Sequence, residues 1–182
     1  MRILAGDPGK VNFALAVIDV QGKNIEILGT RMFQKPIQNL TLDMRQQVKE
    51  FLKEIAAIDK EYGPFDAVSF ERFQSRGLGG NTIEAISLML GVLCFYFTKK
   101  NVPIHVITAS QWQNAFNRHA DLKGLYAEFK MTSKKSPKEI HEFDAAMIAM
   151  YTFYRHNNYV PFKNILKTIY MIIKKFMSCP KL

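Results

Sequence analysis

Residues 66–71 read DAVSFE, and this short stretch decides what kind of sheet the chain can build. Its apolar residues are typical of a buried strand, yet the run ends on Glu71. Removing a carboxylate from water is costly unless a partner compensates for its charge. An earlier apolar run, Met1–Ala5, is followed closely by another acid, Asp7. Two core strands that each lead into a carboxylate predict a functional site at one edge of a sheet.

The rest of the chain supplies the other elements of a mixed α/β sheet. Apolar runs at 12–20 and 25–33 flank a Gln-Gly-Lys-Asn turn and, with the first strand, predict an antiparallel meander. Amphipathic helices separate the later strands, which should therefore run parallel to the first. The further elements expected are helix 41–62, strand 66–71, helix 82–99, strand 103–108 and a helix from 136 to about 155.

Two of these helices have candidate start signals. Asn81 followed by Glu84 is a candidate capping box, and Ser136-Pro137-Lys138-Glu139 combines a cap, a first-turn proline and an acid. Residues 110–135 have no single clear pattern. The element order is that of a ribonuclease H-like domain: a mixed five-stranded sheet in the order 3-2-1-4-5, with helices on both faces and a basic C-terminal helix added.

Composition and charge favour a nucleic-acid partner. The 182 residues, enough for one domain, carry 25 Lys and Arg against 16 Asp and Glu, a formal charge of +9. Such a surplus favours polyanions, although a merely basic soluble protein is the ordinary alternative. The two cysteines, Cys94 and Cys179, have no metal-ligand spacing and suit a reducing cytoplasm. With no secretory signal expected, we predict a cytoplasmic protein with no membrane partner.

Four side chains are the candidate active site. Asp7 and Glu71 should converge because the carboxyl ends of neighbouring parallel strands meet at one sheet edge. His141 and Asp144 lie three residues apart and share one face of the last long helix. Taken singly, a strand-end Asp forms turns, Glu71 could pair with a nearby arginine, and HEFD could be an exposed helix face. Their combination on a basic chain favours a common site.

A divalent cation would explain why these groups gather. Three carboxylates gathered beside an imidazole repel one another unless a positive charge lies between them, and hard ions such as Mg²⁺ or Mn²⁺ prefer oxygen ligands. Two such ions per active site can activate a water and stabilise the leaving oxygen of a phosphodiester. His141 would either bias one site toward Mn²⁺ or transfer a proton.

Three segments resemble the RuvC-like Holliday junction resolvases, a branch of the ribonuclease H-like nucleases. They are ILAGDPGKVNFALAVID at 3–19, VSFERFQSRG at 68–77 and HEFDAAMIAMY at 141–151. The resemblance covers residues 1–155 and implies a nuclease domain there. Residues 156–182 lie past it and are expected to form a basic helical extension that packs on this domain and contacts DNA, although a membrane surface is an alternative. It also implies that Asp7, Glu71, His141 and Asp144 are the catalytic and metal-binding residues. Position 141 is Asp in some members of the family and His in others.

The resemblance further implies a homodimeric endonuclease that binds four-way DNA junctions. Such an enzyme nicks opposed strands symmetrically and leaves 5′-phosphate and 3′-hydroxyl ends. Phe73 would stack on bases at the junction, although a core Phe just past a strand is the equal alternative. The other expected DNA contacts are Lys10, Gln74, Ser75, Arg76, Asn81, Lys134, Lys135 and Lys138.

Helix 82–99 is apolar nearly all the way round, so more than one of its sides should be covered. The resemblance places a dimer contact in this region, and the expected interface residues are Ile86, Leu90, Gly91 and Leu93. Burial under the C-terminal extension is the competing explanation.

Other functions fit parts of the same pattern. A ribonuclease H-fold nuclease acting on flaps, forks or RNA–DNA hybrids would need the same acidic site. An actin- or sugar-kinase-like nucleotide-binding module shares the first D-x-G loop but needs a second phosphate loop and a second domain. A DNA-architectural protein without activity would not need the acidic set. The Lys-, Ile- and Phe-rich composition suggests a phage or an AT-rich bacterium as the source.

Overall fold

The structure is a computed structural model that describes residues 1–22, 24–37, 44–73, 77, 79–119 and 137–157. Its five strands form one sheet in the order β3-β2-β1-β4-β5, which confirms the predicted order. β1 pairs antiparallel with β2 and parallel with β4, and β5 is parallel to β4. The elements are β1 (Arg2–Asp7), β2 (Asn12–Gln21), β3 (Asn24–Gln34), α1 (Met44–Tyr62), β4 (Ala67–Arg72), α2 (Gly80–Lys99), β5 (Ile104–Thr108), α3 (Ala109–His119) and α5 (Pro137–His156).

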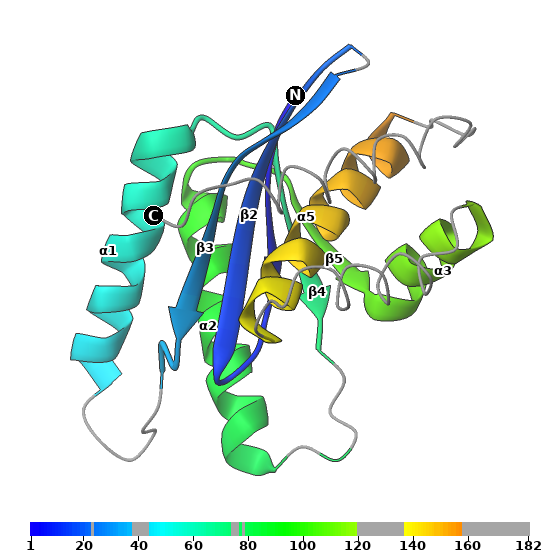
Figure 1. Cartoon of the computed structure of the whole chain (residues 1–182). Coiled ribbons are helices and arrows are strands. Elements are labelled where there is room, and N and C mark those ends of the chain that lie inside the picture. Colours follow the sequence, from blue (N-terminus) through cyan, green and yellow to red (C-terminus); the bar gives the residue numbers. More distant parts are fainter. Residues whose placement is uncertain (23, 38–43, 74–76, 78, 120–136, 158–182) are drawn as a thin grey trace.

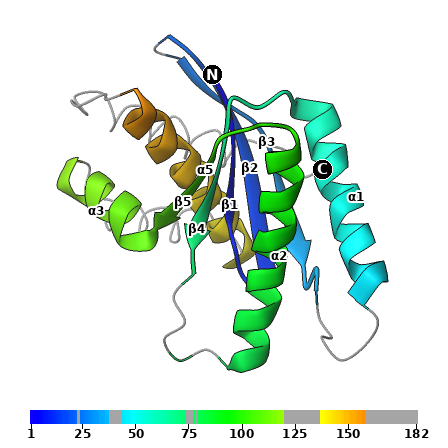
Figure 2. The same cartoon turned by 180° about the vertical axis from the view of Figure 1, so that it is seen from behind.

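Helices cover both faces of the sheet (Figures 1 and 2). α5 crosses one face, over β1 and β2, whereas α1 and α2 lie side by side on the other. Each face has its own apolar cluster. The cluster under α5 combines large apolar residues with many alanines, which include Ala5, Ala16, Ala67, Ala146 and Ala149. Small side chains on both surfaces allow the helix to lie close to the strands.

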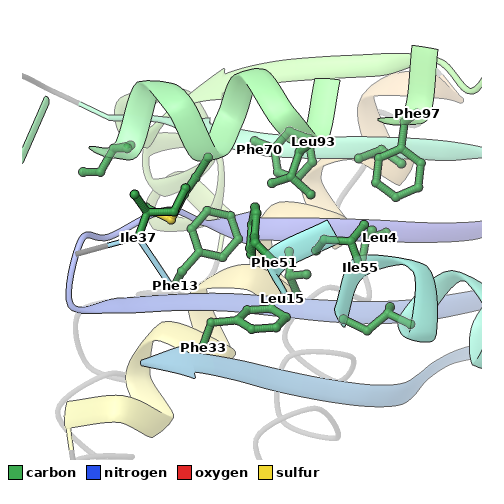
Figure 3. Packing of buried hydrophobic residues seen from close by; sticks show 14 of the residues in the cluster. Leu4, Phe13, Leu15, Phe33, Ile37, Phe51, Ile55, Phe70, Leu93 and Phe97 are labelled. Carbon is green, nitrogen blue, oxygen red and sulfur yellow. The ribbon is translucent and has the colours of Figure 1, made fainter. Parts of the chain in front are cut away.

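The opposite cluster, between the sheet and α1 and α2, is rich in aromatic residues (Figure 3). Phe13, Phe33 and Phe51 pack with tilted or edge-to-face rings at centroid distances of 5.7 to 6.2 Å. Such geometry is favoured between aromatic rings. Gly6 lies in the middle of this packing, because a Cβ there would stand 2.9 Å from both Leu15 and Phe70 side-chain atoms.

The structure differs from the sequence predictions in the start of one helix, the end of one strand and the presence of a further helix. α2 begins at Gly80 with Gly79 as its N-cap and no side-chain cap, so the predicted capping box at Asn81 and Glu84 is wrong. β1 continues to Asp7, which places this carboxylate within the strand. The region without a clear pattern begins with a helix, α3. The C-terminal extension from 158 onward lies outside the described residues.

Candidate active site

Strand alternation places Asp7 and Glu71 on the face of the sheet that α5 covers. Successive side chains of a strand point to opposite faces. In β1, Ile3 and Ala5 belong to the cluster under α5, and Asp7 continues this series. In β4, Ala67 belongs to the same cluster, and Glu71 lies four residues further on. Because Gly6 is in register with Phe70, the two acids follow on adjacent strands at the same end of the sheet.

The first turns of α5 bring the second pair of predicted residues to this place. His141 Nδ1 lies 2.6 Å from Asp7 Oδ2, a direct contact between the helix and the end of β1. The hydrogen bond to Asp7 raises the pKa of His141. Burial opposes this shift, while the negative charges of Asp7 and Glu71 raise the pKa of His141 further. The imidazole therefore favours its protonated form beside these carboxylates.

Glu71 is held by a group from another element. Trp112, on α3, donates a hydrogen bond from its indole Nε1 to Glu71 Oε2 at 2.6 Å. Burial raises the pKa of Glu71 to about 7, in spite of the opposing effect of this hydrogen bond. The charge of Asp7 also raises the pKa of Glu71, whereas His141 lowers it.

The pKa of Asp144 is shifted further than that of Glu71. Burial raises the pKa of Asp144 to about 9, and the charges of Asp7 and Glu71 act in the same direction. Its Oδ1 is buried without a hydrogen-bond partner in the described part of the chain. A carboxylate placed in this way keeps a proton at neutral pH unless a cation takes its place.

The four side chains fit a divalent cation by their chemistry. Three carboxyl groups supply the oxygen ligands that hard ions prefer. Burial is the main cause of the raised pKa values of Glu71 and Asp144, and the charge of Asp7 adds to both. In the described ranges no three such side chains already stand in the arrangement of a metal-binding group. Asp7 instead contacts His141, and Glu71 contacts Trp112. Ion binding would therefore compete with the contact between Asp7 and His141, and it would displace the proton of Asp144.

Comparison with solved structures identifies the fold. The chain matches Thermus thermophilus RuvC in complex with a Holliday junction substrate, with a TM-score of 0.64 and 18% identity over 86% of this chain and 96% of the other. A second Thermus thermophilus RuvC structure matches with a TM-score of 0.65 and 20% identity over 87% and 97% of the two chains. The chain has a RuvC-like fold.

A more distant resolvase has a related structure. The yeast mitochondrial Holliday junction resolvase Ydc2 matches with a TM-score of 0.53 and 14% identity over 91% of this chain and 85% of the other. No family model matches the sequence, and no curated protein does. At these low identities the similarity establishes the RuvC-like, ribonuclease H-like fold alone.

The structure describes some of the residues that were predicted to contact DNA and leaves the others outside the described ranges. Lys10 follows the end of β1, close in sequence to Asp7, and Asn81 is exposed on the first turn of α2. Phe73 is half-buried and packs against the aromatic cluster, in agreement with the alternative explanation for this residue. Lys138 lies in α5, but its side chain is outside the described part of the chain. Also outside it are Gln74, Ser75, Arg76, Lys134 and Lys135.

Two of the four predicted dimer residues point toward the sheet and not toward the outer side of α2. Ile86 is 3% exposed and Leu93 is 0% exposed, because both belong to the cluster between α2 and the sheet. They cannot contact a second subunit while α2 is packed in this way. Leu90 is half-buried, Gly91 is exposed, and Phe95, which was not predicted, is 64% exposed.

The length and composition of α2 would allow it to cross a membrane. Of its most apolar 18-residue stretch, 28% is buried inside the fold. The buried residues are Ala85, Ile86, Met89, Leu93 and Phe97, which attach α2 to the sheet. The helix therefore serves as a core helix of the sheet and still presents apolar surface on its outer side.

Trp112 is the site residue that the sequence predictions missed. A signal for its position exists in Thr108-Ala-Ser-Gln111, which has the spacing of a capping box directly before it. That signal would have placed the start of α3, and with it an indole close to the carboxyl end of β5.

Proposed function

We propose that this chain is a metal-dependent, structure-selective DNA endonuclease that resolves four-way junctions. It would make paired symmetric nicks and leave 5′-phosphate and 3′-hydroxyl ends. The observation that carries the proposal is the 2.6 Å contact between His141 Nδ1, on α5, and Asp7 Oδ2, at the end of β1, the strand that pairs with the one carrying Glu71. The RuvC-like fold and the net charge of +9 support it.

Asp7, Glu71, His141 and Asp144 would hold the divalent ions, Mg²⁺ or Mn²⁺, with two per active site. Such ions supply Lewis-acid chemistry to phosphodiester hydrolysis. Asp144 would lose its proton when the ions bind, because its raised pKa arises from burial and from the charges that the ions neutralise. His141 would exchange its contact with Asp7 for a contact with an ion, or else keep it and move a proton. The two strand acids fix the position of the site relative to the sheet.

Binding of the junction would use the basic charge and a second copy of the chain. Lys10, Asn81, the lysines that precede and open α5, and the loop after Phe73 are the proposed DNA contacts. Phosphate contacts of this kind position DNA without reading its sequence. The proposed dimer packs through the outer side of α2, where Gly91 permits close approach and Phe95 supplies an apolar anchor. The basic extension 156–182 would add packing and further DNA contact.

The decisive experiment is cleavage of an immobile four-way junction with both nick positions mapped. The wild-type chain should cut opposed strands at symmetric positions only when Mg²⁺ or Mn²⁺ is present. Asp7→Asn should lose cleavage and keep junction binding. A panel with flaps, forks and RNA–DNA hybrids separates the alternatives: preferential cutting of any of these over the four-way junction would refute the proposal, as would no metal-dependent cutting at all.

A further inference from the structure

We propose that Trp112 is a positioning residue of the active site: it holds one carboxylate oxygen of Glu71 and leaves the other for a divalent ion. This inference rests on the proposed metal-dependent function. α3 would then be part of the catalytic apparatus, although none of the four acid and imidazole groups comes from it.

The position of α3 is fixed at its first turn. Thr108 ends β5, and its backbone N–H donates to Gln111 Oε1 at 2.8 Å. In return, the Gln111 N–H donates to Thr108 Oγ1 at 3.3 Å. This reciprocal pair is a capping box, which satisfies two backbone donors and sets the direction in which the helix leaves the strand. Trp112 is the next residue, so its direction is set by the same turn.

The indole of Trp112 is then locked against the sheet. Trp112 is 0% exposed and belongs to the cluster under α5, together with Ala5, Phe143 and Ala146. A buried indole N–H needs an acceptor, because it has lost water as a partner. Glu71 supplies that acceptor at 2.6 Å.

The chemistry of indole suits this task. Its N–H is only a donor, so Trp112 can orient Glu71 and stabilise its charge but cannot bind the ion itself. A lysine or arginine at this place would neutralise Glu71 and oppose cation binding. The bond to the indole uses Oε2, and Oε1 is the oxygen that we propose for the ion. Partners that orient metal ligands in this way typically contribute about 10- to 100-fold in metal affinity or activity.

The chain contains its own reporter for this arrangement, because Trp112 is its single tryptophan. Emission excited selectively over the seven tyrosines should change saturably when Mg²⁺ is added to the wild-type protein. In Glu71→Gln the same titration should give no saturable change. This arm needs no variant of Trp112 and no DNA.

A second arm measures ion affinity directly by calorimetry with Mn²⁺. Trp112→Phe keeps an aromatic ring in the cluster and removes the donor, so we expect Mn²⁺ to bind about 10- to 100-fold more weakly. Ile18→Val is the matched control, because Ile18 is buried in the same cluster and lies on β2 away from the acids. It should bind Mn²⁺ as the wild type does, even where thermal unfolding shows similar loss of stability. Junction binding without divalent ions should be unchanged in both variants.

Three results would overturn the inference: wild-type affinity for Mn²⁺ in a folded Trp112→Phe protein, wild-type emission that ignores ions whose binding calorimetry detects, or no ion binding by the wild type. Failure of the proposed function looks different. A protein that binds ions through a Glu71 held by Trp112 but leaves four-way junctions uncut would refute junction resolution and retain the role of Trp112.

Discussion

Asp7 Oδ2 and His141 Nδ1 lie 2.6 Å apart although 134 residues separate them in the chain. The contact joins the last residue of β1 to the beginning of α5, which are the two elements that carry three of the four candidate site residues. It also joins a carboxylate to an imidazole whose pKa it raises. In the proposed metal site, therefore, the imidazole of His141 would compete with a cation for this carboxylate.

Replacing His141 with Asp tests that interpretation. His141→Asp removes the hydrogen bond and adds a negative charge beside Asp7, so the ion-free protein should lose about 2 kcal/mol of stability. The added oxygen ligand suits Mg²⁺ better than imidazole does. We expect junction cleavage to be retained, with the ratio of rates in Mg²⁺ and Mn²⁺ shifted toward Mg²⁺. A folded variant that cleaves in neither ion would contradict the ligand role of position 141.

Stability should depend on pH through Asp144. Its pKa is about 9 in the folded protein against an ordinary 3.8, so between these values the folded state holds a proton that the unfolded state has released. The free energy of unfolding must then fall as pH rises from about 4 toward about 9. Glu71, with a pKa of about 7, contributes in the same direction over a narrower range.

Asp144→Asn removes this dependence because the amide does not ionise. In urea unfolding without divalent ions, the variant should exceed the wild type by about 1–3 kcal/mol near pH 8, and the difference should vanish near pH 4. Glu50→Gln, at an exposed position of α1, is the control and should leave the pH profile unchanged. An Asp144→Asn protein whose stability runs parallel to that of the wild type would show that this carboxyl is not buried as described. The same variant should lose cleavage.

The strand order and the two strand acids could be predicted because their signals are local. Turns of a few residues define the meander, and an acid directly after an apolar run is visible in the sequence itself. Capping signals were less reliable. Asn81 and Glu84 have the right spacing, yet the helix starts earlier, at Gly80, because Gly79 is already extended (φ −70°, ψ 154°) and takes the N-cap position. Thr108 and Gln111 have the same spacing and do form the box.

The side of α2 that packs against the sheet could not be predicted, for a different reason. A helix that is apolar nearly all round has no preferred face, so periodicity cannot tell which side meets the sheet. Only the position of the strands decides that Leu93 points inward and Phe95 outward. The role of Trp112 was not predicted, because the start of α3 was not recognised within residues 110–135 and the indole was therefore not placed beside Glu71.

Gly6 packs in the core directly before Asp7 of the candidate active site, and its position leaves no room for a side chain. A methyl group there would stand 2.9 Å from Leu15 Cδ2 and from Phe70 Cδ1, one residue before Asp7. Gly6→Ala should therefore cost about 1–3 kcal/mol, as overpacking does in other cores. Gly80→Ala is the matched control, because a Cβ at Gly80 meets nothing within 4 Å. Equal melting temperatures for the wild type and Gly6→Ala would contradict this packing.

Phe95 should decide whether two copies associate. On the outer side of α2, Ser87, Gly91 and Phe95 are exposed at successive turns, and Phe95 is the large apolar group among them at 64% exposed. Aromatic anchors of this kind commonly contribute 2 kcal/mol or more to an interface. Phe95→Glu should therefore weaken the dimer by about 30-fold or more in analytical ultracentrifugation. The Phe95→Glu variant should nick one strand of a four-way junction without nicking the opposed strand at the same time, because paired nicking needs two active sites.

Val106→Glu supplies the control for that experiment. Val106 is 58% exposed on β5, a different element, so the variant adds the same charge at a comparably exposed apolar position. It should keep the mass and the paired nicks of the wild type. If Val106→Glu is monomeric and Phe95→Glu is dimeric, the subunits associate through β5 instead, by pairing along an exposed strand edge. If the wild type is monomeric at every concentration, paired nicking must come from two successive binding events, and the homodimer proposal fails.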